Sequence, residues 1–304
     1  MGKNVHNTKE RKMDMEKAKV YFMNKVTPEA VIKLYQTLGI SLPGNVAVKV
    51  HSGEVGNQNF IRPAFFAPMV SLVNGTIVEC NTAYAGKRNT TEEHWKTMKA
   101  HGWTDIASVD IMDEEGEISL PVENGKQLPV NYVGSHLKNY DSMLVLSHFK
   151  GHPMGGYGGA LKNISIGIAS SHGKAYIHGV GDPEKLWTAD HDSFLESMAD
   201  AAKSIVTFFQ GKMAFINVMC NLSVDCDCCA VAEDPAIADI GILASLDPVA
   251  LDQACLDLVY QSDDPGKEHL IERIESRNGV HTIEAAEGLG VGTREYEIIT
   301  IETA

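Results

Sequence analysis

The chain has 304 residues, and its 40 Asp and Glu against 26 Lys and Arg give a formal charge of −14 at pH 7. That length allows two domains or one large α/β unit, and 44% hydrophobic with 22% charged residues is ordinary globular composition. The acidic balance and the lack of a basic stripe exclude the usual nucleic-acid binders, because phosphates would be repelled. No apolar run reaches the roughly 20 residues that cross a bilayer, and the polar N-terminus lacks a signal peptide's apolar core. We therefore expect a soluble, cytoplasmic protein with no membrane partner.

Short apolar runs alternate with amphipathic stretches along most of the chain, as strands alternate with helices. The apolar runs predict strands at 19–23, 46–50, 76–79, 106–110, 143–147, 213–218, 241–244 and 296–301. The amphipathic stretches predict helices at 28–38, 62–73, 91–101, 190–209, 248–261, 267–276 and 282–287. A hairpin is expected at 115–133, with Asn124-Gly125 as its turn.

The alternation predicts an α/β fold with a mostly parallel sheet flanked by helices. We expect two α/β lobes, 19–141 and 142–304, with a cleft between them, after a frayed or disordered N-terminus at 1–18. Ligands of such sheets bind at the carboxyl ends of the strands. The segments that end at His51, Asn81 and His148 are therefore expected to converge.

A glycine-rich stretch at 147–163, SHFKGHPMGGYGGALKN, is the strongest local signal. Its glycines include Gly155, Gly156, Gly158 and Gly159. Glycines let the backbone approach a ligand closely, and the predicted helix start that follows them would offer free N–H groups to an anion. His148, His152 and Lys162 surround the stretch, and His172 and His178 follow. Imidazole and amine groups supply proton transfer, metal ligation or covalent attachment. The alternative is a tight structural turn with histidines that face solvent.

Three cysteines, Cys226, Cys228 and Cys229, follow a predicted strand within the string VDCDCC. Thiolates bind soft or borderline metals, and Asp225 or Asp227 could complete such a site. The spacing C-x-C-C fits neither a zinc ribbon nor a ferredoxin. Free thiols packed in a loop are the alternative.

These strings resemble the DUF362 family, whose members are uncharacterised bacterial and archaeal proteins. The resemblance covers about residues 46–258 and rests on GHPMGGYGGALKNISIGIASS, VDCDCC and DIGILASLDPVALDQACLDLV. Some members carry a ferredoxin insert, which would fall at about 175–191. That segment is short here and has no cysteine, so we expect no ferredoxin-type cluster.

The chain is also similar, more remotely, to the nickel-pincer lactate racemase superfamily. The resemblance implies that His152 transfers protons, Lys162 holds the pincer cofactor and His178 binds nickel. The family's Asp-x-x-Arg-Pro element becomes Asn59-Phe60-Ile61-Arg62-Pro63, and its Gly-His-Arg element becomes Gly86-Lys87-Arg88. Lys87 thus stands where a second catalytic histidine is expected, and it could act as a base only with a lowered pKa.

Three functions follow as hypotheses. The first is a metal- or cofactor-assisted enzyme that acts on a small anion by acid/base or redox chemistry, as a racemase-like enzyme or an oxidoreductase. In it, His152, Lys162 and Lys87 are catalytic, Asn59 and the glycines bind substrate, and Arg62 and Arg88 grip the anion. The second is a non-enzymatic metal or iron–sulfur redox protein with a partner protein. Its ligands would be Cys226, Cys228 and Cys229, and its metal nickel, iron or zinc, whereas His178 is the metal ligand of the first hypothesis. The third is a binding module that has lost catalysis; any of them could form a homo-oligomer.

Overall fold

The computed structural model describes residues 17–302, in which strands and helices alternate along most of the chain. The main strands are β1 (Ala18–Met23), β2 (Val46–Lys49), β3 (Thr76–Glu79), β4 (Val109–Ile111), β7 (Ser142–His148), β10 (Met213–Met219), β11 (Gly241–Ser245) and β12 (Tyr296–Thr300). The helices are α1 (Pro28–Thr37), α2 (Pro63–Leu72), α3 (Thr91–Ala100), α4 (Ala160–Ile164), α5 (Ser171–His178), α6 (His191–Phe209), α7 (Pro248–Gln261), α8 (Lys267–Ser276) and α9 (Val280–Gly288). Two hairpins pair β5 (Glu117–Pro121) with β6 (Val130–Gly134), and β8 (Lys150–His152) with β9 (Gly156–Gly158).

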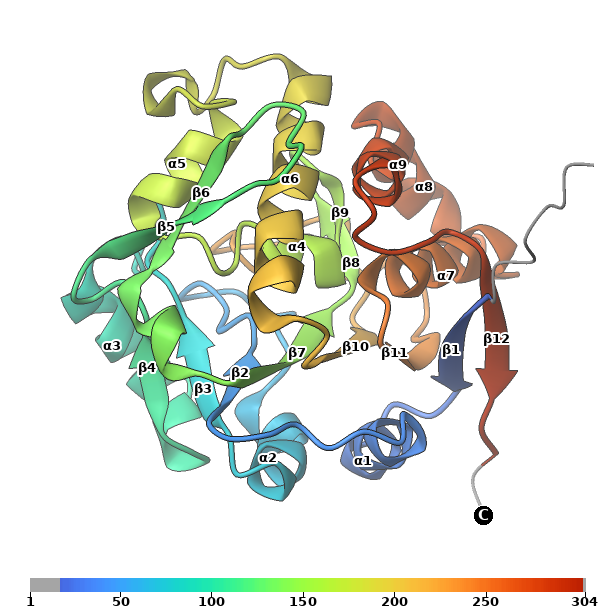
Figure 1. The fold of residues 1–304 in the computed structure, drawn as a ribbon. Coiled ribbons are helices and arrows are strands. Elements are labelled where there is room, and N and C mark those ends of the chain that lie inside the picture. The colour runs from blue at the N-terminus through green and yellow to red at the C-terminus, as the bar shows by residue number, and fades with distance from the viewer. Residues whose placement is uncertain (1–16, 303–304) are drawn as a thin grey trace, which may run out of the picture.

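The main strands form one sheet in the order β12-β1-β11-β10-β7-β2-β3-β4 (Figure 1). Every pair in it is parallel except the two that β11 makes, with β10 and with β1. The predicted α/β fold with a mostly parallel sheet is therefore confirmed. Strands from both expected lobes share this sheet, and β2 pairs directly with β7. Two lobes are not shown, and the domain boundary at residue 142 stays a prediction.

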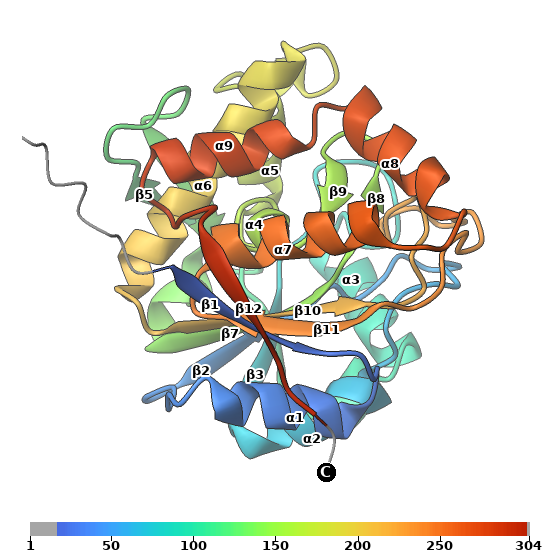
Figure 2. The same cartoon turned by 90° about the vertical axis from the view of Figure 1, so that its right-hand side faces the viewer.

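Helices cover both faces of the sheet, as the view in Figure 2 shows. On one face α1, α2 and α3 pack on side chains such as Val48, Leu146 and Ile216. On the other face α4, α6 and α7 pack on the alternate residues, such as Ala47, Val145 and Phe215. This alternation follows from the two-residue period of a strand, which sends successive side chains to opposite faces.

Local chemistry sets several helix starts where the sequence places them. Pro28 follows Thr27, whose hydroxyl accepts the N–H of Ala30 at 3.2 Å. Pro248 follows Asp247, whose carboxylate accepts the N–H groups of Val249 and Ala250 at 2.9 and 3.0 Å. Both are N-caps followed by a proline that needs no intrahelical donor.

The hairpin β5–β6 exists, but its connection is longer than the predicted Asn124-Gly125 turn. Asn124 has the expected positive φ of 58°, yet residues 122–129 all lie between the strands. The connection is held instead by α6, since Asp200 accepts the N–H groups of Lys126, Gln127 and Leu128 at 2.6–2.8 Å. Such a tertiary anchor leaves no local sequence signal.

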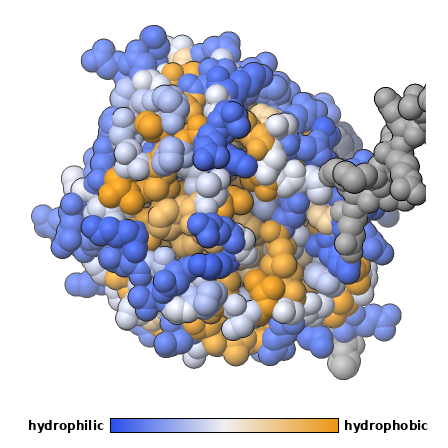
Figure 3. All heavy atoms as spheres, viewed as in Figure 1, coloured by the Kyte–Doolittle hydropathy of each residue, from blue (hydrophilic) through white to orange (hydrophobic). Residues whose placement is uncertain are grey.

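The ends and the surface of the chain bear on two other expectations. Residues 1–16 of the predicted frayed segment lie outside the described part, and Ala18 already belongs to β1. Within residues 17–302 no helix is long and apolar enough to span a bilayer. On the face in Figure 3, hydrophobic residues are interspersed with hydrophilic ones. The large exposed hydrophobic side chains, such as Leu72, Trp187 and Ile298, come from separate elements.

The buried histidines His94, His152 and His178 and the partly buried His51 make stability depend on pH. Burial lowers the pKa of His51, His152 and His178 to about 4 and that of His94 to about 3, against 6.5 ordinarily. Unfolding frees each ring to take a proton below pH 6.5, so the stability that neutral burial provides is lost as pH falls from 6.5 toward 4. Each ring should lower the free energy of unfolding by about 1.4 kcal/mol per pH unit in that window.

The slope is measured by denaturant unfolding between pH 7 and 5. His94→Gln should reduce this slope by about a quarter, because His94 is one of the four histidines that titrate. Among the described residues its ring bonds only to Asn81, at 3.2 Å. An unchanged slope in this variant would contradict the assignment, whatever the variant's absolute stability.

Candidate active site

The carboxyl ends of four neighbouring strands, β10, β7, β2 and β3, meet at one edge of the sheet. A cavity of about 50 Å³ opens there, lined by residues at or after the ends of all four strands, including His51, Cys80, His148 and Cys228. The predicted convergence at the strand ends is confirmed for His51 and His148. The third segment contributes Cys80 and Thr82, whereas Asn81 turns away to contact Thr91 and His94.

Five cationic side chains line this cavity: Lys49, Arg88, Lys150, Lys162 and Lys174. Three of them have carboxylate partners. Lys49 Nζ lies 2.6 Å from Glu79, Lys150 Nζ 3.1 Å from Asp227, and Arg88 Nε 3.2 Å from Glu54. Burial lowers the pKa of Lys49 despite its contact with Glu79. The cavity is thus strongly cationic within a chain of net charge −14.

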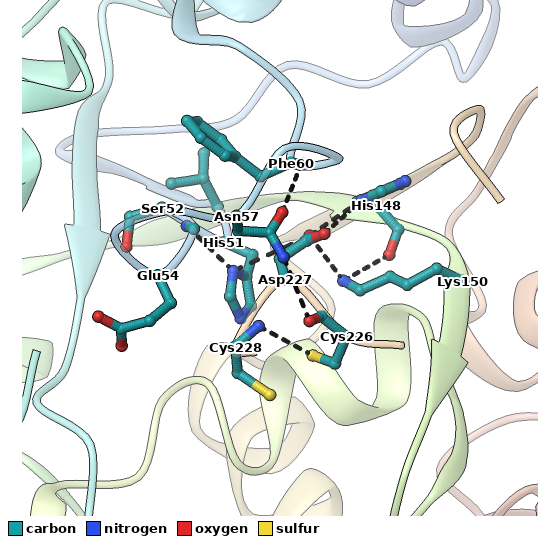
Figure 4. A network of polar contacts seen from close by, with 12 residues as sticks. His51, Ser52, Glu54, Asn57, Phe60, His148, Lys150, Cys226, Asp227 and Cys228 are labelled. Carbon is teal, nitrogen blue, oxygen red and sulfur yellow. Dashed lines mark hydrogen bonds and ion pairs between the residues drawn. The ribbon is translucent and has the colours of Figure 1, made fainter. Parts of the chain in front are cut away.

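The Asp227 carboxylate joins the cysteine segment to the end of β7 (Figure 4). His148 Nδ1 lies 2.9 Å from one carboxylate oxygen, and Lys150 donates to the same oxygen at 3.1 Å. Burial opposes ionisation of Asp227, but His148 and Lys150 outweigh it and hold its pKa well below the usual range. The same carboxylate favours the charged form of Lys150 and raises its pKa against the effect of burial.

The loop after β2 holds the cysteine segment from the other side. Glu54 N–H donates to the Asp227 carbonyl at 2.8 Å, and Asn57 Nδ2 donates to the Cys229 carbonyl at 2.8 Å. Asn57 Oδ1 in turn accepts the N–H groups of Asn59 and Phe60. These bonds fix the backbone that carries Cys226 and Cys228.

His152, Cys226 and Cys228 form a group whose possible ligand atoms all lie within 4.8 Å of one another. His152 Nε2 is 4.0 Å from Cys228 Sγ, and the N–H of Cys228 donates to Cys226 Sγ at 3.4 Å. The Cys228 contact and burial both oppose ionisation of Cys226, yet its pKa is lowered, with Lys162 and Lys150 as the nearby cations. The group is therefore a thiol pair beside an imidazole at the edge of a cationic cavity.

Hydrogen bonding fixes the tautomer of His152. Its Nδ1 accepts the N–H groups of Gly155 at 2.8 Å and Met154 at 3.2 Å. Burial and the Lys162 charge lower its pKa to about 4, so the ring is neutral near pH 7. A neutral ring whose Nδ1 accepts carries its proton on Nε2, which faces the thiols. His152 therefore presents a donor to the sulfur atoms.

The structure places Lys162 and His178 on different cavities. Lys162 lines the cationic cavity, and within residues 17–302 its Nζ has no hydrogen-bond or ion-pair partner. His178 lines a neighbouring pocket with Met154 and Trp187, and stacks on Phe194 at 4.8 Å between ring centroids. Its Nδ1 donates to the Lys174 carbonyl at 2.7 Å, which leaves Nε2 as a free acceptor. His178 does not belong to the group of His152 and the thiols.

The glycines shape the site, but not as a nest for an anion. The N–H groups of Ala160 and Leu161 at the start of α4 donate to Asp252 of α7, at 2.8 and 2.9 Å. The expectation of free N–H groups for a ligand is therefore wrong, because a buried side chain already occupies them. A Cβ at Gly159 would lie 2.4 Å from that carboxylate, whereas one at Gly158 would make ordinary contacts at 3.6 Å or more.

The other glycines contact protein, too. Gly155 donates to His152, and Gly156 has a φ of 77° and approaches Gly279 and the Ile274 carbonyl. Of these four glycines, Gly158 is the one that lies beside two lysines of the cavity, Lys150 and Lys162.

Three predicted site residues lie away from the cavity. Arg62 is exposed, stacks over Phe60 at 3.9 Å and donates to the Gln58 carbonyl, so it does not join Arg88 in a clamp. The Lys87 side chain is 64% exposed and pairs with Glu93 outside the cavity. Asn59 is buried, but it donates to the Glu233 carbonyl and holds a loop together.

Sequence reasoning missed Lys49, Lys150 and Lys174 as site residues, and it named Asp227 only as an alternative to Asp225. Lys49 offered a signal, because it is the single charged residue in the apolar strand segment VAVKV. Lys150 and Lys174 lie within four positions of histidines that the sequence had singled out. Nothing local distinguished Asp227 from Asp225, since both flank the cysteines.

The family described as "Domain of unknown function (DUF362)" matches residues 46–257. The chain belongs to the DUF362 family. No curated protein matches it. Family membership brings no established activity with it.

The solved structures that are similar to this chain include the following two. One is the lactate racemase apoprotein from Thermoanaerobacterium thermosaccharolyticum, at 14% identity and a TM-score of 0.46, covering 79% of this chain and 56% of that one. The other is a structural-genomics target from Thermotoga maritima, at 14% identity and a TM-score of 0.43, covering 86% of this chain and 58% of that one. This chain thus spans little more than half the length of either protein.

Asp227→Asn should destabilise the protein by about 3 kcal/mol, because it removes a buried charge and leaves His148 and Lys150 without their anion. The exposed pair of Glu92 and Lys96 supplies the control, since Glu92→Gln should cost less than about 1 kcal/mol. Denaturant unfolding measures both. Equal losses in the two variants would show that the Asp227 network contributes little.

Two glycine variants distinguish a glycine that the fold requires from one that keeps the cavity open. Gly159→Ala should cost at least about 2 kcal/mol, because its Cβ displaces the Asp252 carboxylate from the start of α4. Gly158→Ala should leave the melting temperature within a few degrees while it narrows the cavity. Thermal melts of both variants check this, and the reverse order of stability would contradict it.

Proposed function

We propose that this DUF362 protein is an enzyme that binds a small anion in the cationic cavity and acts on it by acid/base or redox chemistry. The observation that carries the proposal is the convergence of five cationic side chains with the group of His152, Cys226 and Cys228 at one sheet edge. A positive cavity in an acidic protein focuses the field on the site and draws anions into it.

His152 and the thiols supply the reactive groups in this proposal. The fixed Nε2–H of His152 can donate a proton or stabilise a thiolate, and a thiolate is both a nucleophile and a reductant. Cys228 lines the cavity, so its sulfur can meet a bound anion. Arg88 and Lys162 would hold that anion, as the sequence predicted for Arg88.

The first hypothesis includes a metal, and the side chains present supply only some of the ligands that a metal ion would need. Two thiols fit a soft or borderline metal such as nickel, iron or zinc. His152 does not fit as a ligand in this tautomer, because its acceptor nitrogen is already bound to two N–H groups and its other nitrogen carries the proton. His178 has a free acceptor nitrogen but faces the neighbouring pocket. We therefore derive no step from a metal.

The second candidate is a metal or iron–sulfur redox protein that exchanges electrons with a partner protein. The proximity of the Cys226 and Cys228 thiols favours it. Elemental analysis of anaerobically purified protein distinguishes the candidates. Stoichiometric metal lost in Cys226→Ser but retained in Cys255→Ser, whose thiol is buried in α7, would support the second candidate. Metal-free native protein would contradict it.

Alkylation tests the meeting of anion and thiol. Iodoacetate, an anion, should modify Cys228 on the order of tenfold faster than neutral iodoacetamide, after correction for their rates with a free thiol, because the cavity attracts anions. Peptide mass mapping gives the two rates. Lys162→Gln should reduce the preference, and Lys99→Gln, on the exposed side of α3, should not. Equal corrected rates in the native protein would remove the basis for an anion site at this thiol.

Turnover tests the role of His152. In a screen of small organic anions, His152→Asn should abolish any turnover with little change in melting temperature, because the Asn oxygen can accept the same backbone N–H groups but lacks Nε2. His172→Asn is the control, since His172 is 48% exposed and pairs with Glu117. Turnover that survives in His152→Asn would exclude this histidine from catalysis.

A further inference from the structure

The cavity holds two cations that no carboxylate balances. Lys49, Lys150 and Arg88 each have an acidic partner within 3.2 Å. Within residues 17–302, neither Lys162 nor Lys174 lies within ion-pairing distance of a carboxylate, although Lys174 is 95% buried. When both lysines are protonated, the cavity has two more cations than carboxylates. Burial without a carboxylate partner lowers the pKa of Lys174, and an anion bound beside it would favour the charged form. Excess buried charge is costly unless a counter-ion joins it.

Unused donors accompany these charges. Lys174 Nζ donates to the carbonyls of Ala169 at 2.6 Å and Cys80 at 3.4 Å, which leaves one of its three protons free. Arg88 is 97% buried, and its Nη2 has no hydrogen-bond partner among the described residues. Lys162 Nζ has none either. Three side chains from separate segments thus offer free N–H groups to one cavity.

The size of the cavity limits what can bind. At about 30 Å³ for each water molecule, a cavity of about 50 Å³ holds no more than about two, so it admits one small polyatomic ion or the end group of a larger molecule. Gly158 keeps part of this room open, because its missing side chain would lie 3.6 Å from Lys150 and 3.7 Å from Lys162.

We propose that the cavity recognises a dianionic oxyanion group, such as phosphate or sulfate, through Arg88, Lys162 and Lys174. This inference rests on the proposed anion-binding function and narrows it to a ligand class. Two unbalanced cations match two negative charges, and donors from three segments match an acceptor with oxygens on several sides. Lys174 is thereby a binding residue that the sequence did not indicate.

Calorimetric titration with two probes of similar shape tests the charge. Sulfate is a dianion and methanesulfonate a monoanion, and both are titrated into the full chain at constant ionic strength in chloride. Sulfate should bind at least about tenfold more tightly, because only it pairs with both free lysines. Inorganic phosphate at pH 8, where it is mainly dianionic, should behave like sulfate.

Variants locate the bound ion. Lys174→Met should weaken sulfate binding at least about tenfold and bring it to the level of methanesulfonate, whereas Lys99→Met, a matched change on an exposed site, should have no effect. Gly158→Ala keeps every charge but occupies cavity space, and should also weaken sulfate. Sulfate binding that is unaffected in both Lys174→Met and Gly158→Ala would place the ion elsewhere and overturn the proposal.

The two proposals fail in different ways. Equal binding of sulfate and methanesulfonate would overturn the dianion class, for instance because a Cys226 thiolate neutralises one lysine, and would leave the anion-binding enzyme intact. Binding of neither probe, together with no preference for iodoacetate at Cys228, would overturn both.

Discussion

The site depends on the contacts that the buried Asp227 carboxylate makes with His148 and Lys150. Asp227 lies on the segment after β10, and it bonds to His148 at the end of β7 and to Lys150 at the start of β8. The backbone carbonyl of the same residue accepts the N–H of Glu54 from the loop after β2. One residue thus joins three strand ends and sets the places of Cys226 and Cys228 on either side of it. Because a charge so deeply buried must be paired, these three segments can adopt few other arrangements.

The cationic cavity follows from the parallel sheet. Parallel strands deliver their carboxyl ends to one edge, so that residues distant in sequence gather there. Lys49, His148 and Cys228 come from three strands or from the segments that follow them, and α4 and α5 add Lys162 and Lys174. An acidic exterior around a positive interior repels anions from most of the surface and concentrates them at the cavity.

The role of His152 depends on two backbone N–H groups. Gly155 and Met154 donate to its Nδ1, so its other nitrogen faces the thiols with a proton. The same three residues with the opposite tautomer would suit a metal, since imidazole binds metals through a free lone pair. The turn before β9 therefore favours thiol and proton-transfer chemistry at this group. The proximity of the three side chains alone would not distinguish a metal site from a site of thiol and proton-transfer chemistry.

The sequence by itself determined the α/β class, the bounds of most strands and helices, and the importance of the glycine-rich stretch and the cysteines. These are properties of local patterns: alternation of apolar residues, capping groups such as Asp247, and unusual residue spacing. It also indicated Arg88 and His152. It could not indicate that Arg62 faces solvent while Arg88 is buried, because both arginines follow similar polar loops.

Only the tertiary structure decided which of these groups meet. It placed strands of both predicted lobes in one sheet through the pairing of β2 with β7, which has no local signal. It brought Cys228 to His152 across 76 positions, and placed His178 on a neighbouring pocket. It also occupied the start of α4 with Asp252, 92 positions from Ala160. Contacts at such separations depend on packing of the whole chain, and the residues that make them look locally like many others.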